Sequence, residues 1–239
     1  NSEIICLAGN EEKVRGASYI IALDSDTKIY AGEARELVGA ALHPLNTPVV
    51  DRAAGCVVKG AGIIQPKISV GLDSSSKTYF TRLFAGLGGA DPYGSLAGDI
   101  YQDLCGYGSF NGKGLINVPV YKMCLSDAFP ENTVLSHDIL EGAYLKTKYA
   151  GDIDFSDGFP ARVLSYYSRM HRWVRGDWQN APWLKKYIED GKKIRRKNPL
   201  SDIDKWKIFD NIRRSLVPPM VFLSIILGAV FPARYFTLS

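Results

Sequence analysis

The sequence has few of the residues that mark a disulfide-bonded or zinc-binding protein. Its four cysteines, Cys6, Cys56, Cys105 and Cys124, are far apart and form no Cys-x-x-Cys pair. None of the three histidines lies at a spacing that would complete a zinc site with them. No signal peptide is recognisable. We therefore expect reduced and mostly buried thiols, as in a cytoplasmic domain.

The chain also lacks internal repeats, low-complexity segments and a strong net charge, which is only +4 over 239 residues. Hydrophobic residues make up 46% and charged residues 23%, enough for one substantial globular core with room for an appendage. Basic residues gather near the end of the chain, at Lys185, Lys186, Lys192, Lys193, Arg195, Arg196, Lys197, Arg213 and Arg214. No nucleic-acid-binding motif accompanies them, so nucleic acid is not an expected partner.

What the chain does have at its far end is an uncharged run over residues 216–233, bounded by Arg213, Arg214 and Arg234. Eighteen residues are at the lower limit for crossing a bilayer, and the strongly apolar side chains outweigh Ser224 and Gly228. We expect a transmembrane segment over residues 217–239, with a buried core helix as the alternative. Basic residues just before the span predict that the preceding domain is cytoplasmic.

Residues 201–216 before this run have the pattern of an amphipathic helix. Its apolar arc carries Trp206, Ile208, Phe209, Ile212 and Leu216, and the opposite side carries Lys207, Asp210 and Arg214. Such a helix can lie in the membrane interface or pack against the globular domain, and the pattern leaves both open. At the other end, the chain begins with Asn1 and an apparent strand over residues 4–8. We therefore expect a piece of a longer polypeptide with further chain upstream and downstream.

Residues 17–27, A-S-Y-I-I-A-L-D-S-D-T, form a short apolar run that stops on two carboxylates. The run predicts a strand buried on both faces, with Asp24 and Asp26 projecting from its carboxyl end. Two hard oxygen ligands one residue apart suit a divalent cation that holds a diphosphate. The same spacing occurs in two other triplets, Asp152/Asp154 and Asp202/Asp204, so the preceding strand is what distinguishes the first. A solvated turn is the alternative.

The remaining pattern predicts alternating helices and strands, hence an α/β fold. Helices are expected over residues 32–42, 74–87 and 165–179, and another that begins at Ser136 as its N-cap. Strands are expected over residues 57–70, where Gln65-Pro66 indicates an edge or a bulge, and over 115–120 and 152–155. Residues 88–114 are rich in glycine, which indicates tight turns or a backbone that something approaches closely.

The motifs follow one another in an order that resembles the processive membrane glycosyltransferases of the cellulose-synthase type. The order is Asp24-x-Asp26 after a strand, S-H-D at 136–138, R-M-H-R-W at 169–173, an amphipathic helix and a span. Longer segments are similar to the glycosyltransferase domain of cyclic β-1,2-glucan synthases: I-A-L-D-S-D-T, Y-Q-D-L-C-G-Y-G-S-F-N-G-K-G, F-P-E-N-T-V-L-S-H-D-I-L-E-G and H-R-W-V-R-G-D-W-Q. The resemblance covers nearly the whole chain.

The resemblance implies a partial GT-A domain, Rossmann-like with a mixed sheet, over residues 1–200, then an interfacial helix over 201–216 and the span. It further implies an inverting glucosyltransferase that uses UDP-glucose, extends a β-1,2-glucan and acts at the bacterial inner membrane. Asp24 and Asp26 would hold Mg²⁺ or Mn²⁺, and Asp138 would be the general base. The implied diphosphate-binding residues are Arg169, Arg172 and Lys113. The implied acceptor-binding residues are Trp173, Phe110, Gly112, Gly114 and His137.

Two departures from the family pattern limit what carries over. Arg169 stands where the family has glutamine, and the family's upstream strands for uracil and ribose have no counterpart in this sequence. We therefore expect an incomplete nucleotide pocket and an inactive isolated chain. Weaker site candidates are Gln65, Tyr101, Asp103, Trp178 and Gln179. The alternative function is a non-catalytic glucan-binding or assembly domain at the membrane. A two-carboxylate glycoside hydrolase fits the motifs poorly.

Overall fold

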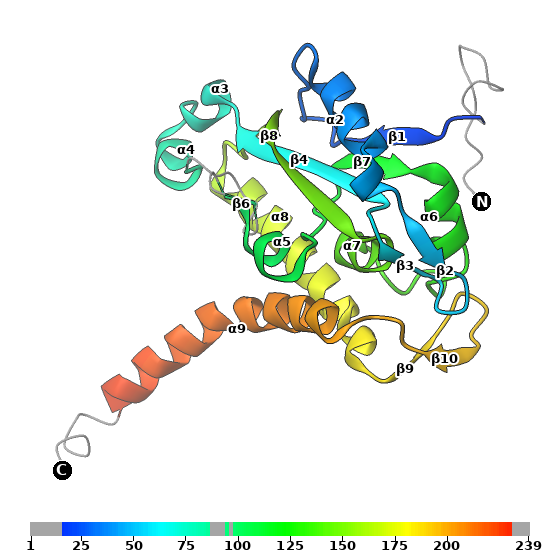
Figure 1. Ribbon diagram of the computed structural model, residues 1–239. Helices are drawn as coiled ribbons and strands as arrows, with labels where there is room; N and C mark the ends of the chain where they lie inside the picture. The colour runs from blue at the N-terminus through cyan, green and yellow to red at the C-terminus, as the bar shows by residue number, and fades with distance from the viewer. Residues whose placement is uncertain (1–15, 87–93, 96–97, 231–239) are drawn as a thin grey trace.

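A four-stranded mixed sheet forms the centre of the computed structural model, which describes residues 16–86, 94–95 and 98–230 (Figure 1). Its strands, in spatial order, are β1 (Tyr19–Ala22), β7 (Gly114–Asn117), β4 (Ile63–Val70) and β8 (Thr147–Asp157). Strand β7 is antiparallel to both β1 and β4, and β4 is parallel to β8. The carboxyl ends of β1, β4 and β8 therefore lie at the same edge of the sheet.

The other described elements surround this sheet and extend below it (Figure 1). The helices are α2 (Glu33–Leu42), α3 (Leu72–Ser75), α4 (Tyr79–Phe84), α5 (Ile100–Cys105), α6 (Val118–Leu125), α7 (Asp138–Leu145), α8 (Val163–Gln179) and α9 (Asp202–Val230), with 3-10 helices η1 (Pro44–Asn46) and η2 (Ala181–Leu184). Two-stranded ribbons pair β2 (Val49–Asp51) with β3 (Cys56–Lys59), β5 (Gly94–Ser95) with β6 (Gly98–Asp99), and β9 (Tyr187–Glu189) with β10 (Arg195–Lys197).

Helices cover both faces of the sheet, because successive strand residues point to opposite sides. Ile64 of β4 belongs to a cluster with Leu37 of α2 on one face. Its neighbour Ile63 belongs to the larger cluster on the other face, with Leu140 of α7. All four side chains are at most 3% exposed. This layered arrangement confirms the predicted α/β class.

Most predicted elements are present, with three corrections to their bounds or kind. The helices expected over 32–42 and 165–179 are confirmed as α2 and α8. The single helix expected over 74–87 is wrong: α3 and α4 are separate, because Thr78 begins α4 with a capping box to Thr81. The N-cap of α7 is His137 rather than Ser136. The strand expected within residues 57–70 is confirmed as β4. The strand expected over 115–120 ends at Asn117, because the Asn117 side chain caps α6.

The expectation for residues 4–8, that for Cys6 and part of the glycine-rich segment 88–114 lie outside the described residues. Of the cysteines that are described, Cys56, Cys105 and Cys124 are free. Cys56 and Cys124 are buried and Cys105 is partly exposed. These three positions agree with the expected reduced thiols.

Strand β1 corrects one prediction about the sheet. It lies at the edge of the described sheet, paired only with β7, and Ile20 is 48% exposed. The expectation of a strand buried on both faces is therefore wrong. An apolar run of this length cannot by itself tell a central strand from an edge strand.

Strand β4 shows the effect expected of Gln65-Pro66, in a different position. The register between β4 and β8 shifts between Pro66 and Lys67, so the predicted bulge is confirmed. The strand is nevertheless central, between β7 and β8. Proline is tolerated there because β7 pairs only with Ile63 and Ile64 and does not reach Pro66.

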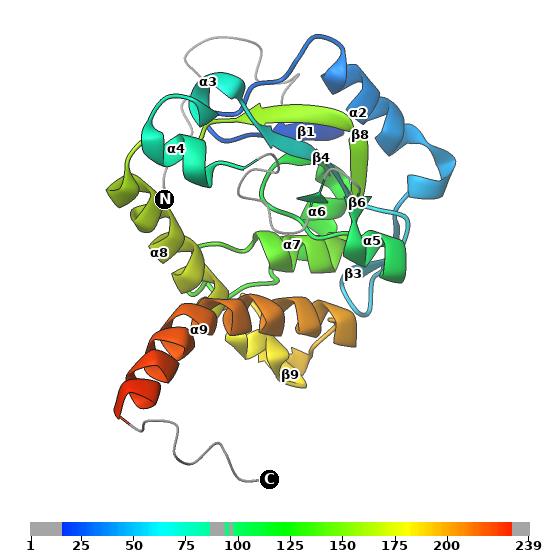
Figure 2. The ribbon, with the colours of Figure 1, turned by 90° about the vertical axis from the view of Figure 1, so that its left-hand side faces the viewer.

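Helix α9 contains both the amphipathic segment and the uncharged run, and its two parts differ in environment. Ile208 and Ile212 are 1% and 8% exposed in the core, whereas the large apolar side chains from Leu216 to Leu227 are exposed. Figures 1 and 2 show the second part projecting away from the domain. The helix contains Pro218 and Pro219, residues that commonly bend a helix.

The projecting part of α9 has the properties of a membrane span. Within the described chain, one helix, at Asp202–Ala229, is long and apolar enough to cross a membrane, and 6% of its most apolar window is buried. That exposure disfavours the alternative of a buried core helix. The first part packs against α8 and η2, so the domain-packing alternative for residues 201–216 is realised by Ile208 and Ile212.

We expect Gly60→Ala to destabilise the chain by about 2 kcal/mol or more. Gly60 has φ of +74°, and an added Cβ would lie 2.0 Å from the carbonyl oxygen of Thr47. Gly39→Ala is the matched control, because Gly39 lies in α2 with nothing within 4 Å of an added Cβ. That change should stabilise by about 0.5–1 kcal/mol. Urea denaturation in mild detergent measures both, and equal effects would contradict the packing described.

Candidate active site

The candidate site lies at the edge where the carboxyl ends of β1, β4 and β8 meet. Asp24 and Asp26 follow β1 in a turn, closed by a hydrogen bond from the Thr27 amide to the Asp24 carbonyl at 3.1 Å. Asp157 is the last residue of β8. The pairing of Ala22 with Gly114 brings the loop before β7 to the same place. Open α/β sheets bind ligands at this edge.

Lys113 joins these strand ends through two ion pairs. Its Nζ lies 2.9 Å from Oδ2 of Asp24 and 2.8 Å from Oδ2 of Asp157, and its side chain is 12% exposed. Burial lowers the pKa of Lys113, but the hydrogen bonds and charges of Asp157 and Asp24 outweigh it, so the net pKa is raised. The Thr27 hydroxyl donates to the other oxygen of Asp157 at 2.6 Å. Lys113 is therefore a fixed cation at this edge.

Helix α8 reaches the same turn through Arg169. A guanidinium nitrogen of Arg169 lies 3.4 Å from Oδ2 of Asp26, and the guanidinium carbon lies 5.8 Å from the centre of the Trp173 ring. Gly158 permits the approach from β8, because a Cβ there would lie 2.8 Å from the Asp26 carboxylate. Trp173 is 38% exposed. The structure thus brings Arg169 to the Asp24/Asp26 turn, with the Trp173 ring beside its guanidinium.

Asp138 begins α7 and lies beneath the loop that carries Lys113. Gly112 covers it closely: φ is +89°, and an added Cβ would lie 3.1 Å from Oδ2 of Asp138. Burial raises the pKa of Asp138, and Glu141 and Asp24 add to the rise, while His137 and Lys113 oppose it. A carboxylate with a raised pKa at the end of a sheet suits a group that accepts a proton.

Sequence reasoning missed Glu141, a buried carboxylate one turn further along α7. His137 Nδ1 lies 2.9 Å from its Oε1, and the Tyr121 hydroxyl donates to the same oxygen at 2.9 Å. The ring of Phe129 stacks on His137 with centroids 5.7 Å apart. The hydrogen bond with Glu141 raises the pKa of His137, although burial lowers it. The apolar residues on both sides of Glu141 in α7 were the signal that could have found it.

Three side chains could also be considered as metal ligands. His137, Asp138 and Glu141 each offer an atom within 4.8 Å of the others. Oε1 of Glu141 pairs with His137 Nδ1 and accepts the Tyr121 hydroxyl, so two of the three groups are paired with each other. Sequence reasoning also missed Asp157 as a site residue. Like Asp24, it lies at the carboxyl end of a strand, and that position was the signal that could have found it.

The other predicted site residues divide into supports and exposed positions. Phe110 is 4% exposed and packs on Gly142. A Cβ added to Gly142 would lie 2.8 Å from the Cβ of Phe110. Gly114 passes close to the Ile64 carbonyl, which leaves no room for a side chain. Arg172 is exposed on α8.

The weaker candidates hold elements together. Gln65 is 1% exposed, and its Oε1 accepts the Asn111 amide at 2.8 Å. Trp178 donates from Nε1 to the Ser215 hydroxyl at 3.1 Å, and Gln179 Oε1 accepts the Leu135 amide at 3.0 Å.

The last two of the weaker site candidates, Tyr101 and Asp103, lie on α5. The Tyr101 ring faces Lys207, and a Cβ on Gly98 would lie 3.3 Å from an Asp103 carboxylate oxygen.

The fold and this cluster of carboxylate, lysine, arginine and tryptophan side chains agree with the class that the motifs resemble, an α/β glycosyltransferase joined to a membrane helix. No family model matches the chain. It is 39% identical over 223 residues, 93% of its length, to cyclic beta-(1,2)-glucan synthase NdvB of Rhizobium meliloti (strain 1021). The chain spans 8% of that protein's length. It is therefore homologous to one segment of a cyclic β-1,2-glucan synthase, and the resemblance drawn from its motifs is confirmed.

We expect Glu141→Gln to lower the pKa of His137, because the change removes the carboxylate that raises it. Since the folded pKa of His137 lies above its ordinary value, the pair stabilises the fold below about pH 6.5 and this stabilisation is lost as pH rises through the folded pKa. The variant should lose that pH dependence. Imidazole proton shifts in an NMR titration measure the pKa, and an unchanged value would contradict the pairing.

Proposed function

We propose that the chain is part of the catalytic domain of an inverting, UDP-glucose-dependent β-glucosyltransferase that extends a β-1,2-glucan at a membrane. The observation that carries the proposal is the meeting of three distant motifs at one edge of the sheet. Asp24 and Asp26, Asp138, and Arg169 with Trp173 come from three parts of the chain, in the order of the family motifs. Homology to a glucan synthase supports the same conclusion.

The proposed cation site uses the two aspartates of the β1 turn. Their side chains are 60% and 40% exposed, so oxygen ligands of a hard cation are accessible there. Mg²⁺ or Mn²⁺ bound to Asp24 and Asp26 would supply positive charge that stabilises the leaving diphosphate. Lys113 and Arg169 already pair with the same carboxylates, so both cations would lie beside the diphosphate. Arg172 is a further proposed contact to the phosphates.

The proposed transfer step needs one proton acceptor. The acceptor hydroxyl oxygen forms a bond to the anomeric carbon of glucose, the bond from that carbon to UDP breaks, and the hydroxyl proton passes to Asp138. Burial, which raises the pKa of Asp138, favours this transfer. Gly112 and Gly114 let the loop that lines the acceptor side lie close to Asp138 and to the Ile64 carbonyl. Trp173 would offer a flat ring to the acceptor sugar, and Phe110 and His137 support this side of the site.

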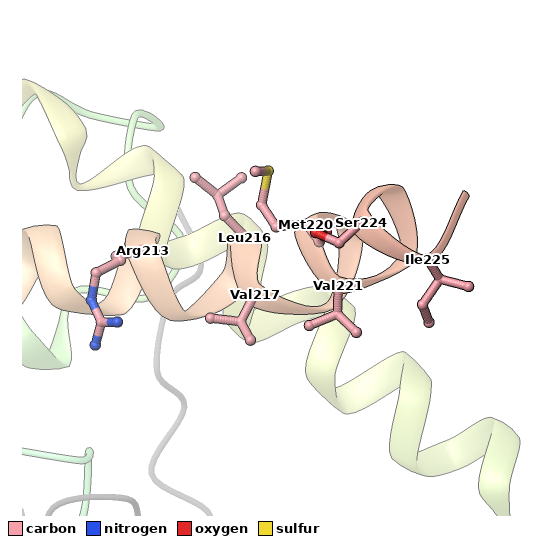
Figure 3. A pocket seen from close by; sticks show the side chains of 7 residues that line it. All are labelled: Arg213, Leu216, Val217, Met220, Val221, Ser224 and Ile225. Carbon is pink, nitrogen blue, oxygen red and sulfur yellow. The ribbon is translucent and has the colours of Figure 1, made fainter. Parts of the chain in front are cut away.

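In the proposed organisation, one helix joins the catalytic part of the chain to the membrane span. Residues 1–200 form the catalytic part, residues 201–216 the connecting helix and residues 217–239 the span, with Arg213 and Arg214 on the cytoplasmic side of a bacterial inner membrane. An open apolar groove runs along α9 where the connecting helix passes into the span (Figure 3). It is lined by Arg213, Leu216, Val217, Met220, Val221, Ser224 and Ile225. It lies outside the candidate site and suits contact with lipid.

We expect Asp138→Asn in the full-length enzyme to lower glucan synthesis by at least about 10²-fold, because a general base contributes about that much or more. UDP-glucose binding should stay within about twofold. Asp152→Asn is the control, an exposed aspartate on β8 away from the site. Incorporation of labelled glucose into glucan gives the readout. Synthesis retained in Asp138→Asn would remove Asp138 as the base. Glucan binding by the wild type without UDP-glucose binding or glucan synthesis would favour the glucan-binding alternative.

In the full-length enzyme, Asp24→Ala and Asp26→Ala should each weaken metal-dependent UDP binding by about tenfold or more, because each removes an oxygen ligand of the cation. Calorimetric titration of UDP at several Mn²⁺ concentrations measures this. The second Asp-x-Asp triplet provides the control, since Asp152→Ala should leave the titration unchanged. A metal dependence that survives in both Asp24→Ala and Asp26→Ala would place the cation elsewhere.

A further inference from the structure

Lys207 is a buried lysine that the proposed chemistry does not use. The helical pattern placed it on the polar side of the segment 201–216, yet its residue is 3% exposed. An ammonium group loses its hydration on burial, so it needs close partners within the protein. Its surroundings therefore show which part of the domain it holds.

The partners of Lys207 lie at the start of the loop over residues 107–113. Its Nζ donates to the carbonyl oxygens of Gly108 at 2.7 Å and Tyr107 at 3.3 Å. The same nitrogen lies 4.5 Å and 4.8 Å from the ring centres of Tyr107 and Tyr101. Backbone carbonyls and aromatic faces thus replace the water around this cation. Asp204, Asp99 and Lys146 are charged groups whose electric fields act on this cation.

The first turn of α9 supports the same attachment. The Ser201 hydroxyl and the Tyr107 hydroxyl are 2.9 Å apart. Asp204 pairs with Lys146 at 2.9 Å, and Lys146 lies 4.0 Å from the Tyr107 ring. Tyr107 is therefore contacted by Ser201, which directly precedes α9, by Lys146, which pairs with Asp204 of α9, and by Lys207 itself.

From this attachment the loop leads directly to the candidate site. The Ser109 amide is bound by Asp99 at 3.1 Å and the Asn111 amide by Gln65 at 2.8 Å. Gly112 then covers Asp138, and Lys113 pairs with Asp24 and Asp157. Contacts with other elements therefore hold this loop at residues 108, 109, 111, 112 and 113. Lys207 thus holds the start of the loop that ends in the groups covering the carboxylates, and Asp99 and Gln65 hold its middle.

We propose that Lys207 is a positioning residue through which α9 holds the loop 107–113 over the candidate site. The inference rests on the proposed function for its effect on turnover, while its effect on the loop does not. It links the two parts of the molecule: the helix that continues into the proposed membrane span also fixes the loop that carries Gly112 and Lys113.

The experiment compares Lys207→Met and Lys207→Arg in the full-length enzyme. Methionine keeps the apolar stem and removes the donor, and arginine keeps a charge and donors. Hydrogen exchange should quicken at least tenfold for the amides of residues 107–113 in Lys207→Met, with residues 63–70 of β4 unchanged. Turnover at saturating UDP-glucose should fall at least tenfold. Lys207→Arg should lose less of both.

Lys205→Met is the matched control, a lysine on the same helix whose partner is Asp202 at 3.9 Å, and it should leave exchange and turnover unchanged. Loop protection equal to wild type in Lys207→Met would overturn the proposal. Loss of protection spread equally over β4 would also overturn it, because the role would then be structural only. If Lys207→Met does not fold, the neutral variant Lys207→Gln decides by the same criteria. If the loop exchanges faster in Lys207→Met but the wild-type protein transfers no glucose, the proposed function is overturned and the role of Lys207 in holding the loop is not.

Discussion

The arrangement of the candidate site depends on one buried cation, Lys113, held between Asp24 and Asp157. These two carboxylates belong to the ends of β1 and β8, strands that are separated by β7 and β4 in the sheet. Three charges so close together can be accommodated because opposite signs alternate, and the two ion pairs offset the cost of taking the lysine out of water. This interaction fixes where the loop before β7 lies, and therefore where Gly112 covers Asp138.

Helices α7 and α8 approach this cation because small residues leave room for them. Gly142 lets Phe110 pack on α7, and Gly176 lets α8 pack on the loop before α7, where a Cβ would lie 2.7 Å from that of Ser136. Gly158 leaves space for Asp26. A side chain at any of these points would separate the carboxylates, the arginine and the tryptophan. Close packing is thus what brings residues far apart in the chain into one site.

Helix α9 connects this site to the proposed membrane span without a flexible linker. Its first turns are part of the domain core through Ile208 and Ile212, and Lys207 binds the loop that leads to Lys113. Its later turns are exposed and apolar. A catalytic part fastened in this way would keep a fixed orientation toward the bilayer, which is what a synthase that passes a growing chain along a membrane requires.

The sequence by itself determined the α/β class, the bulge near Pro66, helices α2 and α8 and the apolar end of α9, because these follow from periodicity and local backbone chemistry. It also placed Asp24, Asp138 and Arg169 in their family order. It could not assign β1 to an edge, find Glu141 and Asp157, or reveal that Lys207 is buried, because these depend on which segments meet. Periodicity records only whether a side chain faces the core, whereas partners are decided by contacts between distant parts of the chain, and only the tertiary structure contains those.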